Sequence, residues 1–229
     1  MTTRRHDLED VAALAGEVAS RLLALIEDSQ AAGRVPHIVL TGGSVAAEVH
    51  RELGRVGPAS GVDWGAVEFW WGDERWLPEG DPDRNATSAR ADFLDVVGAR
   101  LVHEMPASDQ GMDLRQAAAS YSELVRRSAG HGFDVVMLGM GPDGHVASIF
   151  PGHPAGDVDA IVVPVTESPK PPPQRLSLST EALSHTTNLW FILSGPQKAA
   201  VAEQVLSGDS DLPAARVHAS DEAIWFIAS

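Results

Sequence analysis

The distribution of apolar residues along the chain predicts alternating helices and strands. Apolar residues recur with helical spacing from Leu8 to Ile26, which predicts a first helix over residues 8–30 that Gly33 and Pro36 end. Further helices are predicted over residues 45–53, 86–97, 112–128 and 197–206. Short apolar runs predict strands at residues 38–40, 67–71, 101–105, 133–138, 161–165, 175–179, 188–194 and 223–227.

This alternation indicates an α/β fold with an open, mostly parallel sheet and helices on both faces. Strands that are apolar almost throughout are typical of a sheet that is covered on both sides. The chain has 229 residues, of which 44% are hydrophobic, so it can bury a sizeable core. No internal repeat interrupts the pattern, and we expect residues 1–229 to form a single domain.

Composition and charge narrow the classes of function. The chain has no cysteine, which excludes disulfides, thiolate chemistry and cysteine-based zinc sites, and suits the cytoplasm. A formal net charge of -15 argues against a nucleic-acid partner. No apolar run is long enough to span a bilayer, and the N-terminal residues do not resemble a signal peptide. An anionic small molecule remains compatible with this charge if a few cations converge in one pocket.

Three predicted strands end in loops that are rich in glycine or charge, and ligands of open α/β sheets bind at such ends. The first loop is Thr41-Gly42-Gly43-Ser44, directly before a predicted helix. Glycines let backbone approach an anion, and the helix N-terminus offers free N–H groups, so Gly42, Gly43 and Ser44 suit a phosphate. The equally plain alternative is a tight turn with Ser44 as the helix N-cap.

The second loop is Gly72-Asp73-Glu74-Arg75, which follows the strand at residues 67–71. Arg75 can clamp a phosphate with its planar guanidinium, and Asp73 can bind sugar hydroxyls or orient a catalytic group. A solvated loop with a local ion pair is the competing interpretation, and the motif alone favours it.

The third loop, residues 139–145, carries the candidate general base. His145 follows a strand end that contains Gly139, Gly141 and Gly144, and imidazole exchanges protons near neutral pH. Asp143 either holds this imidazole or simply starts an Asp-Gly turn. Later in the chain, Lys170 and Arg175 flank a proline run and Lys198 follows another strand end, so these three cations are candidates for the same rim.

Taken in order, these residues resemble the 6-phosphogluconolactonase family. The strongest likeness is the segment from Leu138 to Gly152, which is similar to the family's Leu-Gly-x-Gly-x-Asp-Gly-His-Thr-Ala-Ser-Leu-Phe-Pro. The supporting segments are Thr41-Gly42-Gly43-Ser44, Trp71-Gly72-Asp73-Glu74-Arg75 with Pro78 and Asn85, Lys170-Pro171-Pro172 with Arg175-Leu176-Ser177-Leu178, and Gly195 with Lys198. Departures from the family pattern are Val45-Ala46 in place of Thr-Pro, Arg84 in place of a serine, and Val146 in place of a threonine.

The resemblance implies a fold shared with glucosamine-6-phosphate deaminases and ribose-5-phosphate isomerases. It also implies hydrolysis of 6-phosphoglucono-1,5-lactone to 6-phosphogluconate in the oxidative pentose phosphate pathway, with no cofactor and no metal. His145 is then the catalytic base, with Asp73 and Asp143 as catalytic residues that orient His145 or the sugar. The residues expected to bind substrate or phosphate are Gly42, Gly43, Ser44, Arg75, Gly141, Gly144, Lys170, Arg175 and Lys198.

Three other functions compete with this one. A deaminase that isomerises aldose to ketose has a glutamate where Phe150 stands, and a phenyl ring cannot transfer protons. A non-catalytic phosphosugar sensor keeps the pocket but normally carries a DNA-binding domain, which the acidity of this chain disfavours. A metal hydrolase would need Asp73, His145 and His153 to meet by folding, since no His-Glu-x-x-His occurs. We expect a monomer or a weak homo-oligomer.

Overall fold

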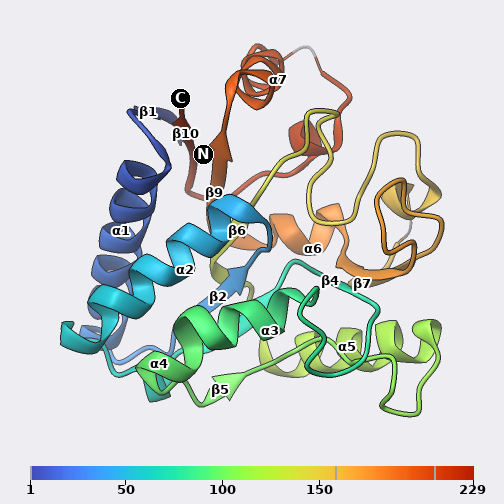
Figure 1. The fold of residues 1–229 in the computed structure, drawn as a ribbon, viewed down its shortest axis with the longest axis horizontal. Coiled ribbons are helices and arrows are strands. Elements are labelled where there is room, and N and C mark those ends of the chain that lie inside the picture. The colour runs from blue at the N-terminus through green and yellow to red at the C-terminus, as the bar shows by residue number, and fades with distance from the viewer. Residues whose placement is uncertain (1, 158, 209) are drawn as a thin grey trace.

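A seven-stranded parallel sheet forms the centre of the molecule (Figure 1). The computed structural model describes residues 2–157, 159–208 and 210–229. The strand order in the sheet is β1-β10-β9-β6-β2-β3-β5, and every neighbouring pair is parallel. Its strands are β1 (Thr2–Leu8), β2 (His37–Leu40), β3 (Glu68–Trp71), β5 (Leu101–Val102), β6 (Phe133–Leu138), β9 (Thr186–Ser194) and β10 (Glu222–Ala228).

Helices cover this sheet, as the apolar strands predict. All four residues of β2 are buried, and so are six of the seven residues of β10, which requires cover on both faces. The helices α1 and α2 pack against each other and against β10 and β9, respectively (Figure 1). The helices are α1 (Val11–Ala31), α2 (Ser44–Val56), α3 (Asn85–Ala89), α4 (Asp95–Val97), α5 (Leu114–Ser128), α6 (Thr180–Ser184) and α7 (Pro196–Leu206).

The order of the strands creates a switch point between β2 and β6. From β2 the chain proceeds outward through β3 to β5, and then returns to the other side of β2 to form β6, β9 and β10. Connections on the two sides therefore diverge, which opens a crevice beyond the carboxyl ends of β2 and β6. The turn at residues 41–43 and the loop at residues 139–145 both begin at this crevice.

A second, antiparallel sheet stands beside the first, and the sequence pattern did not predict it. Its order is β4 (Asp73–Arg75), β8 (Arg175–Leu178), β7 (Val162–Val165). The predicted strands at residues 161–165 and 175–179 are thus real but do not join the parallel sheet. Only a short proline-rich loop links them, and a parallel pair needs a crossover of a dozen or more residues. The predicted polar loop around Asp73 is in part a strand, because it pairs with β8.

Other differences from the predicted elements have local causes. β1 is an exposed, polar edge strand, so it lacks the apolar run that marks the others. The first helix begins at Val11 rather than at residue 8 because the Asp10 side chain accepts a hydrogen bond from the N–H of Ala13 and caps it. The predicted helix over residues 86–97 contains a π-helical turn, Arg90–Leu94, between α3 and α4. No helix in the described ranges is both long and apolar enough to cross a membrane.

Candidate active site

A cavity of about 260 Å³ lies at the switch point between β2 and β6. The turns that follow β2, β3, β6 and β9 supply its walls, together with the loop between β7 and β8. The lining residues are Thr41, Gly42, Gly43, Asp73, Arg75, Asn85, Gly139, Met140, Gly141, His145, Ala147, Lys170, Pro171, Arg175 and Lys198.

Most of the residues that the sequence singled out line this cavity, although they are scattered from position 42 to position 198. Those that line it are Gly42, Gly43, Asp73, Arg75, Gly141, His145, Lys170, Arg175 and Lys198. Ser44, Asp143 and Gly144 do not line it. Ser44 is exposed as the first residue of α2, and the N-cap position belongs to Gly43, so the alternative role of Ser44 as N-cap is wrong.

His145 is held by an aspartate on one side of its ring and meets a lysine on the other. Its Nδ1 lies 2.5 Å from Oδ1 of Asp143, and its Nε2 lies 3.4 Å from Nζ of Lys170. Burial lowers the pKa of His145, the Asp143 carboxylate opposes this shift and Lys170 reinforces it, so the neutral imidazole is favoured at pH 7. With Nδ1–H donated to Asp143, the lone pair is on Nε2, which is the form a general base requires.

The turn that carries His145 depends on two glycines. A Cβ on Gly141 would lie 2.1 Å from the His145 ring and 2.3 Å from the Asp143 carboxylate, so only glycine leaves room for the pair. Gly144 has a φ of 78°, and a Cβ there would meet the Leu212 side chain. The N–H of Gly141 donates to the carbonyl of His145, which closes the loop onto itself.

The first turn presents backbone to the cavity at the start of α2. Gly43 adopts a φ of 98°, which is unfavourable for other residues, and no side chain caps the helix. The free N–H groups of the first turn of α2 therefore remain available at the positive end of a helix dipole. A Cβ on Gly42 would lie 1.9 Å from Oδ1 of Asn85, so the turn and Asn85 fit together only with glycine there.

Asp73 is buried and is not the partner of His145. Its Oδ2 accepts a hydrogen bond of 2.6 Å from Oγ of the buried Ser148 and lies 3.7 Å from Nη1 of Arg175. The sequence left open whether Asp73 or Asp143 orients the imidazole. The structure gives that contact to Asp143, while Asp73 lines the cavity and bonds to Ser148.

Arg175 uses most of its donors within the protein. Its guanidinium donates to the carbonyls of Lys170, Pro171 and Pro172, and to Oγ of Ser148 at 3.5 Å. It thereby holds the loop of residues 170–172 over the cavity. This loop carries Lys170 to His145, so Arg175 supports the reactive end of the site even though few of its donors remain for a ligand.

The cavity is strongly cationic in a chain whose formal net charge is -15. Four cations line it, namely Arg75, Lys170, Arg175 and Lys198, against the single carboxylate of Asp73. The Nε of Arg75 is buried and has no protein partner among the described residues. Burial, reinforced by the positive charge of Lys170, lowers the pKa of Lys198.

Several lining residues received no role from the sequence. Asn85 donates from Nδ2 to the carbonyl of Asp73, and its position in the motif that follows Arg75 was the one available signal. Ala147 has a φ of 49°, a left-handed conformation that is uncommon for alanine and that no sequence pattern marks. Thr41, Gly139, Met140 and Pro171 also contribute to the wall.

Comparison with known proteins identifies the family. A family model described as "Glucosamine-6-phosphate isomerases/6-phosphogluconolactonase" matches residues 9–225. The chain belongs to this family. The match includes every residue that lines the cavity, and it confirms the resemblance found in the sequence.

Individual members of the glucosamine-6-phosphate isomerase/6-phosphogluconolactonase family are similar over nearly the whole chain. A 6-phosphogluconolactonase of Streptomyces coelicolor is 38% identical over 94% of this chain and 88% of its own length. One of Mycobacterium tuberculosis is 39% identical over 93% of this chain and 91% of its own. The structure is also similar to a crystal structure of 6-phosphogluconolactonase from Thermotoga maritima. The match covers both chains completely, with a TM-score of 0.89 and 27% identity, and confirms the α/β fold.

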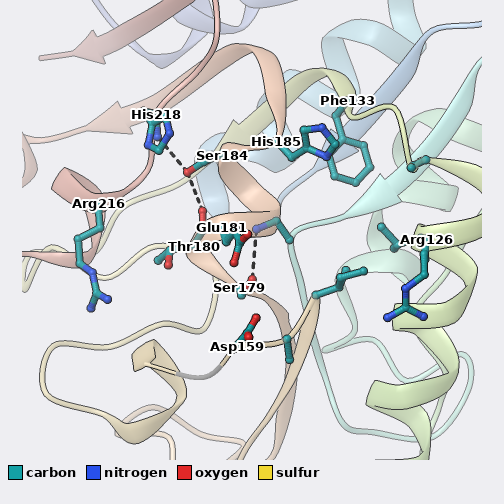
Figure 2. Close-up of a pocket in the computed structure, with 16 residues that line it drawn as sticks. Arg126, Phe133, Asp159, Ser179, Thr180, Glu181, Ser184, His185, Arg216 and His218 are labelled. Carbon is teal, nitrogen blue, oxygen red and sulfur yellow. Dashed lines mark hydrogen bonds between the residues drawn. The ribbon is translucent and has the colours of Figure 1, made fainter.

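A larger cavity of about 870 Å³ lies at the opposite end of the parallel sheet, where β6 and β9 begin (Figure 2). Figure 2 shows Arg216 and Arg126 on opposite sides of it, so no cluster of cations forms. Its serines are engaged locally: Ser184 donates to the carbonyl of Thr180, and Ser179 caps α6. This cavity lacks the convergent chemistry of the smaller one, so the cavity at the switch point is the candidate active site.

Metal ligation was the third possibility that the sequence raised. Among the described residues, no group of three or more histidine, aspartate or glutamate side chains is arranged to hold a metal ion. His153 instead bonds from Nε2 to the carbonyl of Thr166, outside the cavity, so the proposed meeting of Asp73, His145 and His153 does not occur.

Proposed function

We propose that this chain hydrolyses 6-phosphoglucono-1,5-lactone to 6-phosphogluconate in the oxidative pentose phosphate pathway. The observation that carries the proposal is the His145–Asp143 pair: Nδ1 contacts Asp143, and Nε2 faces Lys170 at a cavity lined by four cations. A neutral base suits the activation of water, and a cationic wall suits a phosphorylated substrate. Residues 1–229 act as one catalytic domain.

Substrate binding divides between two parts of the cavity. The free N–H groups at Gly43 and the start of α2, together with Arg75 and Lys198, hold the phosphate, with Ser44 adding its hydroxyl at the edge. The unpartnered Nε of Arg75 supports this role because a buried donor gains most from an anion. Asp73 accepts hydrogen bonds from the sugar hydroxyls, and Asn85 donates hydrogen bonds to them.

The reaction proceeds in two proton transfers at His145. Nε2 takes a proton from water as the water oxygen attacks C1, and the carbonyl electrons move to the oxyanion. The imidazolium, stabilised by Asp143, then returns that proton to the ring oxygen O5 as the C1–O5 bond breaks. Lys170 stabilises the oxyanion, since it lies at the reactive end rather than beside the phosphate. The backbone N–H groups of Gly141 and Gly144 hold the turn instead, because they donate to the carbonyls of His145 and Gly141.

Phe150 argues against the competing activity, that of an isomerising deaminase. Its ring centroid lies 4.6 Å from that of His145, so an apolar wall stands where a deaminase requires a residue that transfers protons. A sensor without catalytic activity would have no need for a base that an aspartate orients. We place the enzyme in the cytoplasm as a monomer or weak homo-oligomer that needs no cofactor.

A substrate comparison tests the proposal. Purified protein is assayed for proton release, above the spontaneous rate, with 6-phosphogluconolactone and with unphosphorylated gluconolactone, and for ammonia release from glucosamine 6-phosphate. We expect efficient turnover of the phosphorylated lactone, a kcat/KM lower by about a hundredfold or more for the unphosphorylated one, and no ammonia. Ammonia release, or equal rates for the two lactones, would overturn the assignment.

A further inference from the structure

Glu74 is a buried carboxylate between two residues of the cavity wall. It is the central residue of β4 and is 1% exposed, while its neighbours Asp73 and Arg75 line the cavity. Because side chains alternate along a strand, Glu74 points away from the cavity. A buried carboxylate costs several kcal/mol of desolvation unless it is paired and hydrogen-bonded, so its partners indicate what it does.

Three backbone donors converge on this carboxylate. Oε1 accepts from the N–H of Arg75 at 2.8 Å and from that of Asn85 at 2.8 Å, and Oε2 accepts from the N–H of Ala86 at 2.9 Å. Glu74 therefore ties β4 to the first residues of α3, which lie about ten positions further along the chain. Two cavity residues, Arg75 and Asn85, have their backbones attached to the same side chain.

Arg84 supplies the countercharge from an equally buried position. It is 2% exposed, and its Nη2 lies 3.9 Å from Oε2 of Glu74. The guanidinium also donates to the carbonyls of Leu77 and Met105, which fix its place. Burial raises the pKa of Glu74, and Arg84 and the backbone donors oppose that shift. From the neighbouring elements, the Arg175 guanidinium and the Tyr121 hydroxyl also interact with the Glu74 charge. Arg84 is one of the positions where the chain departs from the family pattern.

We propose that the buried Glu74–Arg84 pair is a positioning device that sets the Arg75 and Asn85 side chains for substrate. Arg84 keeps Glu74 ionised, and the ionised carboxylate accepts all three N–H donors at once. Asn85 in turn donates to the carbonyl of Asp73 and packs against Gly42. Through Asn85, the Glu74–Arg84 pair therefore also supports Asp73 and the turn at Gly42. The inference rests on the proposed lactonase function.

The test replaces Arg84 with methionine, which keeps bulk and removes charge. Without the guanidinium, Glu74 takes up a proton at a higher pH and loses acceptor capacity. We expect KM for 6-phosphogluconolactone to rise about tenfold at pH 6 and to recover as pH rises. Binding of 6-phosphogluconate, measured by calorimetry at both pH values, is expected to weaken in parallel, whereas kcat changes little.

Three companion variants separate positioning from simple stabilisation. Arg84→Lys keeps the charge and is expected to retain the wild-type pH profile. Glu74→Gln combined with Arg84→Met removes both charges of the pair and serves if the single variant fails to fold. This double variant is expected to raise KM equally at every pH. Arg90→Met lies in the adjoining helical turn, where Arg90 pairs with Glu104 and Asp95 outside the cavity, and it is expected to leave KM and the pH profile unchanged.

A wild-type KM and pH profile in Arg84→Met, with only a lower melting temperature, would overturn the positioning role. A wild-type KM in the double variant would do the same. If the wild-type protein itself fails to hydrolyse the lactone, the proposed function fails, and 6-phosphogluconate binding by the same variants still decides the inference.

Discussion

Asp143 and His145, two residues apart in one glycine turn, contact each other side chain to side chain: Oδ1 of Asp143 lies 2.5 Å from Nδ1 of His145. Such a local pair needs no distant element to form. The loop bonds between Gly141 and His145 and between Gly144 and Gly141 hold it together. The other elements then supply the cations of the cavity, of which Lys170 contacts Nε2.

The charges around His145 predict opposite shifts of the pH profile for two variants. The rate depends on neutral imidazole, so kcat/KM falls as pH decreases through the pKa of His145. Asp143 raises this pKa and Lys170 lowers it. Asp143→Asn should therefore move the acid limb to lower pH, and Lys170→Met should move it to higher pH.

Asp143→Asn should also reduce kcat by about a hundredfold, since an amide no longer selects the correct imidazole tautomer. The measurement is kcat/KM against pH for both variants beside the wild type. Shifts in the same direction, or no shift in either variant, would contradict the assignment of His145 as the base that these two charges tune.

Loss of a phosphate ligand is expected to appear in KM. Arg75→Met removes the guanidinium whose Nε is buried at the cavity, and Lys198→Met removes the half-buried ammonium at the start of α7. Each should raise KM by about tenfold to a hundredfold, because a hydrogen bond to a charged group contributes about 1.5–3 kcal/mol. The same variants should leave the rate with unphosphorylated lactone nearly unchanged. An equal loss with both lactones would place these cations elsewhere than at the phosphate.

Gly141→Ala should disable the base without contacting substrate. The added methyl would lie 2.1 Å from the His145 ring and must displace it, and a displacement of about 1 Å costs on the order of a hundredfold in rate. Gly72→Ala is the matched control, since a Cβ there meets its neighbours at 3.7 Å, an ordinary contact. Steady-state kcat of the two variants makes the comparison, and comparable activities would contradict the packing argument.

His50 makes stability depend on pH. This ring is 3% exposed, stacks on Phe93, and has its pKa lowered by burial from 6.5 to about 4. The unfolded chain therefore binds more protons between these values, and the free energy of unfolding decreases as pH falls through that window, by up to about 3 kcal/mol. His50→Phe should abolish this part of the dependence. Chemical denaturation of both proteins at pH 7 and pH 4 measures it, and an identical loss in the variant would rule His50 out.

The sequence predicted the elements whose pattern is local. The strand β6 (Phe133–Leu138) was predicted to the residue because it is apolar except at Asp134 and has glycines on either side. By contrast, β4 consists of three charged residues, and only its pairing with β8, about a hundred positions away, makes it a strand. A strand that forms only through such distant pairing need not show the alternation of apolar and polar residues by which strands are predicted.

The candidate site divides in the same way. Glycine turns and charged residues at strand ends identified nine residues that line the cavity, since the ends of neighbouring parallel strands must meet. The sequence did not decide between Asp73 and Asp143 as the partner of His145. It also did not reveal that the Arg175 guanidinium donates most of its hydrogen bonds to the loop of residues 170–172. Both depend on side-chain directions, which spacing does not determine.

The measurement that tests the central claim most directly is the turnover of 6-phosphogluconolactone by His145→Gln beside the wild type, corrected for spontaneous hydrolysis. Glutamine keeps a polar side chain but cannot take up the proton, so kcat should fall by about 10²–10⁴-fold. Binding of 6-phosphogluconate, which depends on Arg75, Lys198 and the turn at Gly43, should persist. A variant that binds product and still turns over at the wild-type rate would show that His145 is not the base.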